Sequence, residues 1–155
     1  MNSSQLRDLI IKPALSDLVM LSDNAIELMM FTCAVESLGG TYLKQLTGPA
    51  LGIYQMEPAT YNDIWQNYIA NNSKLLLVLL SNFGCHNMSS EDRLVYDLRF
   101  ATAMTRIHYA RVPQALPLKD DIEAMWDYYK EHYNSSRGAA EKAQSIQKYY
   151  TFIKS

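Results

Sequence analysis

A glutamate at the end of an apolar segment is the residue in this sequence best suited to acid catalysis. Glu36 follows Phe31, Cys33, Ala34 and Val35, so we expect apolar surroundings for its carboxyl group. Burial among apolar groups disfavours the anion and raises the pKa of a carboxyl, and the negative end of a helix acts in the same direction. A carboxyl that stays protonated near neutral pH can donate a proton to a leaving oxygen. Taken alone, however, Glu36 fits a solvated helix-end carboxylate better.

The segment after this glutamate is rich in glycine and ends in a second motif. Five glycines and prolines fall within residues 39–57, which predicts a loop, with room for a small hairpin. The loop leads into the sequence Gly52-Ile53-Tyr54-Gln55-Met56-Glu57-Pro58-Ala59-Thr60. This second motif follows Glu36-Ser37 at a plausible spacing, and the pair favours a functional role for Glu36.

Together the two motifs resemble those of the soluble-type lytic transglycosylases and, more distantly, those of goose-type lysozymes. In these families a helix ends in Glu-Ser, and a loop leads to Gly-Leu-Met-Gln and a Pro-Ala-Thr helix start. Glu36-Ser37 matches the first motif, and the second is matched by Gly52-x-x-Gln55-Met56-x-Pro58-Ala59-Thr60. The resemblance implies a mainly α, lysozyme-like fold in a single domain spanning residues 1–155.

The resemblance also implies an activity, which is cleavage of the bond between N-acetylmuramic acid and N-acetylglucosamine in peptidoglycan. Glu36 would first protonate the glycosidic oxygen while the substrate's own N-acetyl group assists at the anomeric carbon. Glu36 would then act as a base, so that the 6-hydroxyl of the sugar closes a 1,6-anhydro ring. No metal or organic cofactor is implied, and the expected partners are peptidoglycan glycan strands.

Four residues of the motifs are expected to contact the substrate. Ser37 would hydrogen-bond the catalytic carboxylate or the acetamido group, and Gly52 would let the backbone approach the sugar closely. Gln55 would donate and accept hydrogen bonds at the N-acetyl group, and Tyr54 would cover a sugar face. Met56 is expected in the core.

A third element of the family is an Ala-Tyr-Asn segment late in the domain, whose tyrosine approaches the catalytic glutamate. Tyr133-Asn134 is the candidate here. It departs from the family pattern because His132 replaces the alanine and the following glycine is displaced. The other interpretation is a helix end with Asn134 as terminator. We favour the functional interpretation.

Glycosidases usually pair the acid with a second carboxylate, and the sequence offers no close candidate. No Asp or Glu lies between Ser37 and Met56, and Glu57 and Asp63 are the first that follow. Glu57 occupies a variable motif position and is expected to be a solvated helix-start charge. A mechanism with one carboxylate therefore fits better. The alternatives are a hydrolytic lysozyme with Glu57 or Asp63 as base, and a non-catalytic wall-binding or structural protein with the same fold.

The elements that must position these residues are helices, judged from apolar spacing and capping residues. Pro13 should interrupt or kink the first helix, and the aromatic side chains of Trp65, Tyr68 and Trp126 are expected to pack internally. The predicted helices run from Ser4 to Lys12, from Ser22 or Asp23 to Glu36, from Pro58 through Tyr68, from Asn72 to Leu80, from Ser89 or Ser90 to Ala110, from Leu118 to His132 and from Gly138 to Ile153.

The composition narrows the class of protein. A chain of 155 residues with 48% hydrophobic and 19% charged residues is typical of one globular domain. A net charge of −2 argues against a nucleic-acid binder. The longest apolar stretch, residues 75–80, is too short to span a bilayer, so no membrane insertion is expected. The N-terminus lacks the pattern of a secretory signal, so we expect action in the periplasm or cell wall after delivery with a virion or release through a pore or secretion machine.

Cysteine and histidine give no sign of a metal site. Cys33 and Cys85 do not make a disulfide framework, and Cys33 is expected to be a buried free thiol. The histidines His86, His108 and His132 lack metal-ligand spacing. The adjacent Cys85-His86 pair is too little to predict zinc.

Overall fold

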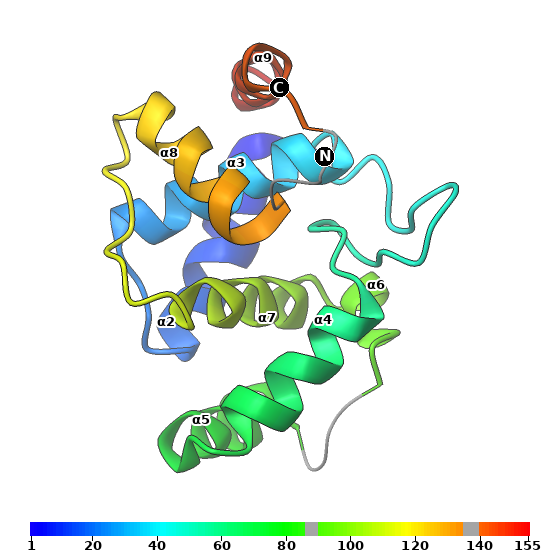
Figure 1. Cartoon of the computed structure of the whole chain (residues 1–155), viewed down its shortest axis with the longest axis vertical. Coiled ribbons are helices and arrows are strands. Elements are labelled where there is room, and N and C mark those ends of the chain that lie inside the picture. The colour runs from blue at the N-terminus through cyan, green and yellow to red at the C-terminus, as the bar shows by residue number, and fades with distance from the viewer. Residues whose placement is uncertain (86–89, 135–139) are drawn as a thin grey trace.

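The computed structural model describes residues 1–85, 90–134 and 140–155, and it confirms the mainly α class (Figure 1). Within these residues there is no strand, and the loop over residues 39–57 contains only two isolated antiparallel bridges, Lys44 with Leu51 and Leu51 with Met56. The α-helices and π-helical turns (η) are α1 (Ser3–Gln5), η1 (Leu6–Ile11), α2 (Lys12–Asp17), α3 (Asp23–Ser37), α4 (Pro58–Asp63), η2 (Ile64–Ile69), α5 (Ser73–Phe83), α6 (Arg93–Tyr96), α7 (Leu98–Ala110), α8 (Ile122–Tyr129), η3 (Lys130–Asn134) and α9 (Lys142–Ile153).

The first helical region does not stop at Lys12 as predicted, because α1, η1 and α2 follow one another without a break. Pro13 lies in the first turn of α2. The N–H of Lys12 bonds to the carbonyl of Arg7, five residues earlier. This wider π-helical turn relieves the clash that a proline ring makes with the preceding turn. The proline is therefore accommodated within the helix.

Helix α3 is the central element, and twelve of its 15 residues are buried. It begins as predicted, where the hydroxyl of Ser22 accepts a hydrogen bond from the N–H of Ala25 at 3.1 Å. It packs against α7, α8 and α9 (Figure 1). It ends at Ser37, because Leu38 adopts a left-handed conformation with φ of 52°, one residue before the predicted glycine pair. This ending leaves Glu36 in the last turn of a buried helix.

The long helix predicted from Ser89 or Ser90 to Ala110 is instead two helices, α6 and α7. The break is at Asp97, which has extended backbone angles (φ −114°, ψ 93°). Its carboxylate accepts from the N–H of Phe100 at 2.9 Å, which caps α7, and also pairs with Arg93. The apolar spacing continues across this break and therefore concealed it. Ser89 lies outside the described residues.

Helix α8 begins at Ile122, four residues later than the predicted Leu118. Asp121 determines this start, since its carboxylate accepts from the N–H of Ala124 at 3.0 Å. The π-helical turn η3 then carries the chain to Asn134.

The remaining helices agree with the predictions apart from single ends. Helix α4 begins at Pro58, and Asn72 caps α5, which runs three residues beyond the predicted Leu80. Helix α9 ends at Ile153 as predicted, whereas Gly138, its predicted start, lies outside the described residues.

The core confirms the packing role predicted for the large aromatic residues. Trp65 and Trp126 are buried, and Tyr68 is half-buried with its hydroxyl donating to the carbonyl of Ala110. Cys33 is a buried free thiol, as predicted, and its burial raises its pKa to about 12. Among the described residues, no helix combines the length and apolar character needed to cross a bilayer.

Candidate functional site

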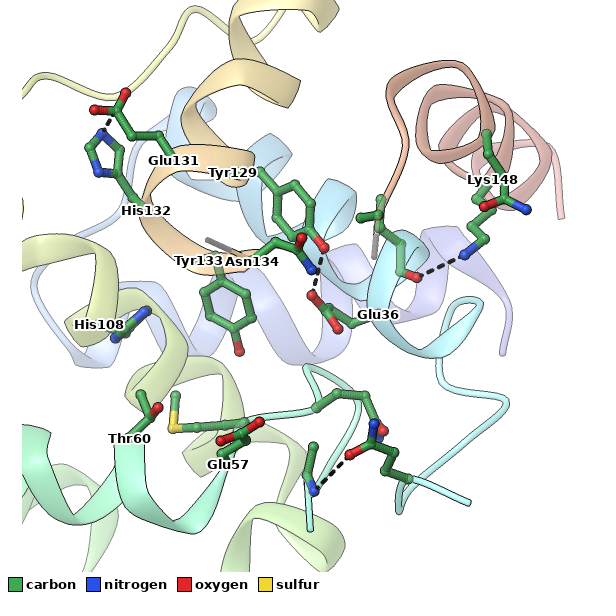
Figure 2. Close-up of a pocket in the computed structure, with 17 residues that line it drawn as sticks. Glu36, Glu57, Thr60, His108, Tyr129, Glu131, His132, Tyr133, Asn134 and Lys148 are labelled. Atoms are coloured by element: carbon green, nitrogen blue, oxygen red, sulfur yellow. Dashed lines mark hydrogen bonds and ion pairs between the residues drawn. The ribbon is translucent and has the colours of Figure 1, made fainter. Parts of the chain in front are cut away.

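A cavity of about 740 Å³ opens beside the end of α3 (Figure 2). Its walls come from α3, the loop over residues 45–57, α4, α7, α8, η3 and α9. The residues that line it are Val35, Glu36, Gln45, Ala50, Gln55, Met56, Glu57, Thr60, His108, Tyr129, Glu131, His132, Tyr133, Asn134, Ala140, Gln144 and Lys148. Most of these side chains are polar, and the volume is sufficient for a small ligand or a few sugar units.

Glu36 projects into this cavity from the last turn of α3 (Figure 2). Burial raises the pKa of its carboxyl, as the sequence predicted, while hydrogen bonds from Tyr129 and Asn134 and the charge of Lys148 lower it. The burial effect is the largest, so the pKa remains above its ordinary value. No lysine or arginine of the described chain forms an ion pair with this carboxylate. Glu36 is thus a half-buried carboxyl suited to donate a proton.

Tyr129 is a hydrogen-bond partner of Glu36 that was not predicted from the sequence. Its hydroxyl donates a hydrogen bond of 2.6 Å to Oε1 of Glu36. The predicted late motif lies beside it: Tyr133 and Asn134 both line the cavity. The hydroxyl of Tyr133 donates instead to the carbonyl of Tyr54 at 2.8 Å. Tyr129 precedes Tyr133 by four residues, so both rings lie on one face of the same helical segment, and that spacing is the signal that could have identified Tyr129.

Comparison with protein-family models, curated proteins and solved structures gave no match to this chain. Its function must therefore be inferred from the motifs and from the side chains in the cavity.

Ser37 does not contact the cavity, so the predicted substrate contact is wrong. Its side chain is fully buried, and its hydroxyl donates to the carbonyl of Ile53 at 2.6 Å. The same oxygen accepts from the N–H of Gly40 at 2.9 Å. Ser37 therefore ties the end of α3 to the loop that carries Gln55. Its contribution to the site is to position Glu36 and the loop.

The predicted sugar contacts of Gly52 and Tyr54 are also wrong. Gly52 has a φ of 75°, and a Cβ there would come within 2.2 Å of the carbonyl oxygen of Leu94. Glycine is thus required by protein packing rather than by a sugar. The side chain of Tyr54 is 1% exposed, and its hydroxyl bonds with Thr102 at 3.0 Å. Both residues support the loop through contacts inside the protein, and neither lines the cavity.

Gln55 does line the cavity, and its predicted contact with the N-acetyl group stays a prediction. It has a left-handed φ of 49°, which is uncommon for a residue other than glycine. Its side-chain Nε2 donates to the carbonyl of Gly52 at 2.8 Å and fixes the side chain on the wall. Met56 is buried, as predicted, although it also reaches the cavity wall.

The two candidates for a second carboxylate differ in position. Glu57 is exposed and lies on the cavity wall, across from Glu36 in Figure 2. Asp63 does not line the cavity. Hydrogen bonds from Asn67 and Arg111 hold the pKa of Asp63 below its ordinary value, and its distance to Arg111 is 2.6 Å. Asp63 is engaged in an ion pair away from the cavity, which contradicts its candidacy as a base.

A neutral histidine forms part of the wall opposite α9. Burial, together with the charge of Arg111, lowers the pKa of His108 to about 4, and its Nδ1 lies 2.5 Å from the Arg111 guanidinium. The ring is therefore uncharged near neutral pH, with Nδ1 as acceptor. Four further residues of the cavity wall were not predicted from the sequence: Thr60, His108, Glu131 and Lys148.

Within the described residues, no group of three or more His, Cys, Asp or Glu side chains is arranged to hold a metal ion. Cys85 is buried, and its neighbour His86 lies outside those residues.

Proposed function

We propose that this chain is a peptidoglycan lytic transglycosylase with a lysozyme-like fold. The observation that carries the proposal is the position of Glu36, a half-buried carboxyl of raised pKa on the wall of a polar cavity. Among the described residues, no lysine or arginine forms an ion pair with it. The two motifs that resemble the family support it, because Gln55 and the Tyr133-Asn134 segment line the same cavity as Glu36. We further propose that it acts on the cell wall after delivery with a virion or through a secretion machine.

The proposed reaction uses Glu36 twice. Its protonated carboxyl gives a proton to the glycosidic oxygen, and the bond from that oxygen to the muramoyl anomeric carbon breaks as the neighbouring N-acetyl oxygen bonds to that carbon. The carboxylate left behind then accepts the proton of the 6-hydroxyl. That oxygen bonds to the anomeric carbon, displaces the N-acetyl oxygen and closes the 1,6-anhydro ring. No water is consumed.

Tyr129 has a defined role in this sequence. Its hydroxyl donates to Glu36 at 2.6 Å, so it fixes the direction of the carboxyl and stabilises the anion that exists between the two steps. Asn134 acts in the same direction, since its hydrogen bond to Glu36 also favours the anion.

A second candidate, hydrolysis by a lysozyme mechanism, is favoured by one observation. Glu57 lines the wall across the cavity from Glu36 and is solvent-exposed, so it has access to water (Figure 2). A base that activates water on the far face of the sugar belongs in such a position. In that case Glu57 would be required for activity and the product would have a reducing end.

Mass spectrometry of digested, purified cell walls tests both candidates. The transglycosylase proposal expects 1,6-anhydro-muramoyl products from the wild-type chain and nearly unchanged rates from Glu57→Gln. Reducing muramoyl ends, together with loss of activity in Glu57→Gln, would establish the hydrolase instead. A non-catalytic wall-binding protein predicts no soluble product and a Glu36→Gln variant with all biological activity intact.

A further inference from the structure

Lys148 is a cation in the wall of the proposed active site. It projects from α9 toward the end of α3, where Glu36 lies (Figure 2). It is half-buried. Among the described residues that line the cavity, Lys148 is the single lysine or arginine, and the carboxyl side chains there are those of Glu36, Glu57 and Glu131. The cavity is therefore acidic apart from the wall that α9 supplies.

The charge of Lys148 is not neutralised by any carboxylate of the described chain, because none forms an ion pair with it. Its ammonium makes one long contact, 3.5 Å, with the carbonyl oxygen of Val35. An ammonium has three donors, so the described residues leave most of its hydrogen-bonding capacity available to a ligand. Lys142, on the same helix, differs in this respect, since it pairs with both Glu123 and Asp127.

When no ligand is bound, the charge of Lys148 works against keeping Glu36 protonated. The positive charge of Lys148 lowers the pKa of Glu36 and so opposes the effect of burial, which keeps the carboxyl protonated. An anion bound at Lys148 would cancel this field and leave the carboxyl better able to hold its proton until transfer. The position of Lys148 near Glu36 is therefore consistent with a ligand whose negatively charged group binds at Lys148.

We propose that Lys148 binds a carboxylate carried by the glycan substrate. This inference rests on the proposed function and adds a specificity-determining residue to it. In a strand of alternating N-acetylglucosamine and N-acetylmuramic acid, carboxylates occur on the lactyl group of muramic acid or on the peptide attached there. A lysine with unused donors forms charge-assisted hydrogen bonds with such a group. Glycans with the same N-acetyl groups and no carboxylate are then the weaker ligands.

The test measures binding by calorimetry to the full chain carrying Glu36→Gln, which prevents turnover. Three short strands serve as ligands: one with free lactyl carboxylates, one with these groups converted to amides, and one bearing peptides with free carboxylates. We expect the carboxylate strands to bind about tenfold more tightly than the amide strand, the usual scale for a hydrogen bond to a charged group. A preference limited to the first strand assigns the lactyl group, and one limited to the third assigns the peptide.

Added variants attribute the preference to one side chain. Lys148→Gln should abolish it, and Lys148→Arg should keep most of it because the charge remains. Lys154→Gln is the matched control, since it removes the same charge from the end of the same helix at an exposed residue that does not line the cavity. An unchanged preference in Lys148→Gln, or no preference in the parent chain, would overturn the inference.

The two proposals can fail separately, and product release by the chain with Glu36 intact distinguishes failure of the Lys148 inference from failure of the proposed function. If that chain releases 1,6-anhydro products from cell walls while Lys148→Gln binds all three strands as its parent does, only the inference about Lys148 is wrong. If no product is released and no strand binds, both the proposed function and the inference fail.

Discussion

Two glutamates on the same helix, Glu27 and Glu36, show how surroundings separate a structural carboxylate from a candidate acid. Both lie on α3 and both accept a hydrogen bond from a tyrosine hydroxyl of a later helix, Glu27 from Tyr149 and Glu36 from Tyr129. The difference is the counter-ion. Glu27 is 8% exposed and pairs with Arg7 at 3.1 Å.

The counter-ion decides what each carboxyl can do. A buried carboxylate paired with a guanidinium has a structural role, because removing one partner leaves the other charge buried and unpaired. Its partner Arg7 lies on η1 and Tyr149 lies on α9, so Glu27 joins the two ends of the chain to α3. Glu36 has a tyrosine and an amide in place of the guanidinium and opens onto a cavity. It can therefore exchange a proton with a ligand, whereas Glu27 does not line the cavity.

The largest effect expected from this comparison is on catalysis. Glu36→Gln should reduce the rate of cell-wall cleavage by at least roughly a hundredfold, the usual scale for a general acid, because the amide has no proton of suitable acidity to donate. Turbidity loss of purified walls measures the rate, and circular dichroism checks that the fold is retained. A rate in Glu36→Gln within a few fold of the wild type would show that this carboxyl is not the acid.

Glu27→Gln, near the other end of α3, should lower stability and leave activity unchanged. Glu27→Gln leaves the Arg7 guanidinium without its carboxylate, so we expect a loss of about 2 kcal/mol in the free energy of unfolding. Activity per folded molecule should stay the same, since Glu27 does not line the cavity. Urea denaturation followed by fluorescence measures the stability. A loss of activity at full folding would contradict the division of roles between the two glutamates.

The contrast also explains which parts of the site could be predicted from the sequence. The apolar run before Glu36 was enough to predict a buried helix and a raised pKa, because those properties depend on residues nearby in the sequence. The roles of Ser37, Gly52 and Tyr54 were wrong for a different reason. A hydroxyl or a missing Cβ can serve a ligand or the protein itself, and contacts with distant residues decide which.

The same distinction between local patterns and specific side-chain contacts applies to the fold. Apolar spacing predicted the helices, and residue type predicted a cap at Ser22 or Asp23, whereas the break at Asp97 follows from a carboxylate that bonds to Phe100 and to Arg93. Tyr129 was missed because its partner lies 93 positions away, and its four-residue spacing from Tyr133 is the one local sign of its place in the site. Long-range partners of this kind are not contained in local patterns.

A smaller effect is expected when the hydrogen bond to Glu36 is removed and the carboxyl is kept. Tyr129→Phe eliminates a bond that favours the anion, so the pKa of Glu36 should rise further. The group must be protonated to act as acid, and the alkaline limb of the pH–rate profile should therefore move to higher pH. The maximal rate should fall by roughly tenfold, because the carboxyl is less well oriented and its anion less stabilised. An alkaline limb that moves to lower pH would contradict this assignment of Tyr129.

The smallest expected effect is on the stability of Glu36→Gln itself, and its sign depends on pH. The pKa of Glu36 is raised in the folded protein, so between the unfolded value of about 4.3 and the folded value the native state binds more protons than the unfolded state. Stability therefore falls as the pH rises through this interval, and the cost of ionising Glu36 is fully present above it. Glutamine removes that cost. We expect Glu36→Gln to melt about 2 °C above the wild type at pH 7.5 and at the same temperature near pH 3.5, where the wild-type carboxyl is also neutral. Thermal melts at the two pH values measure the difference, and equal effects at both would mean that the burial of Glu36 does not disfavour its anion.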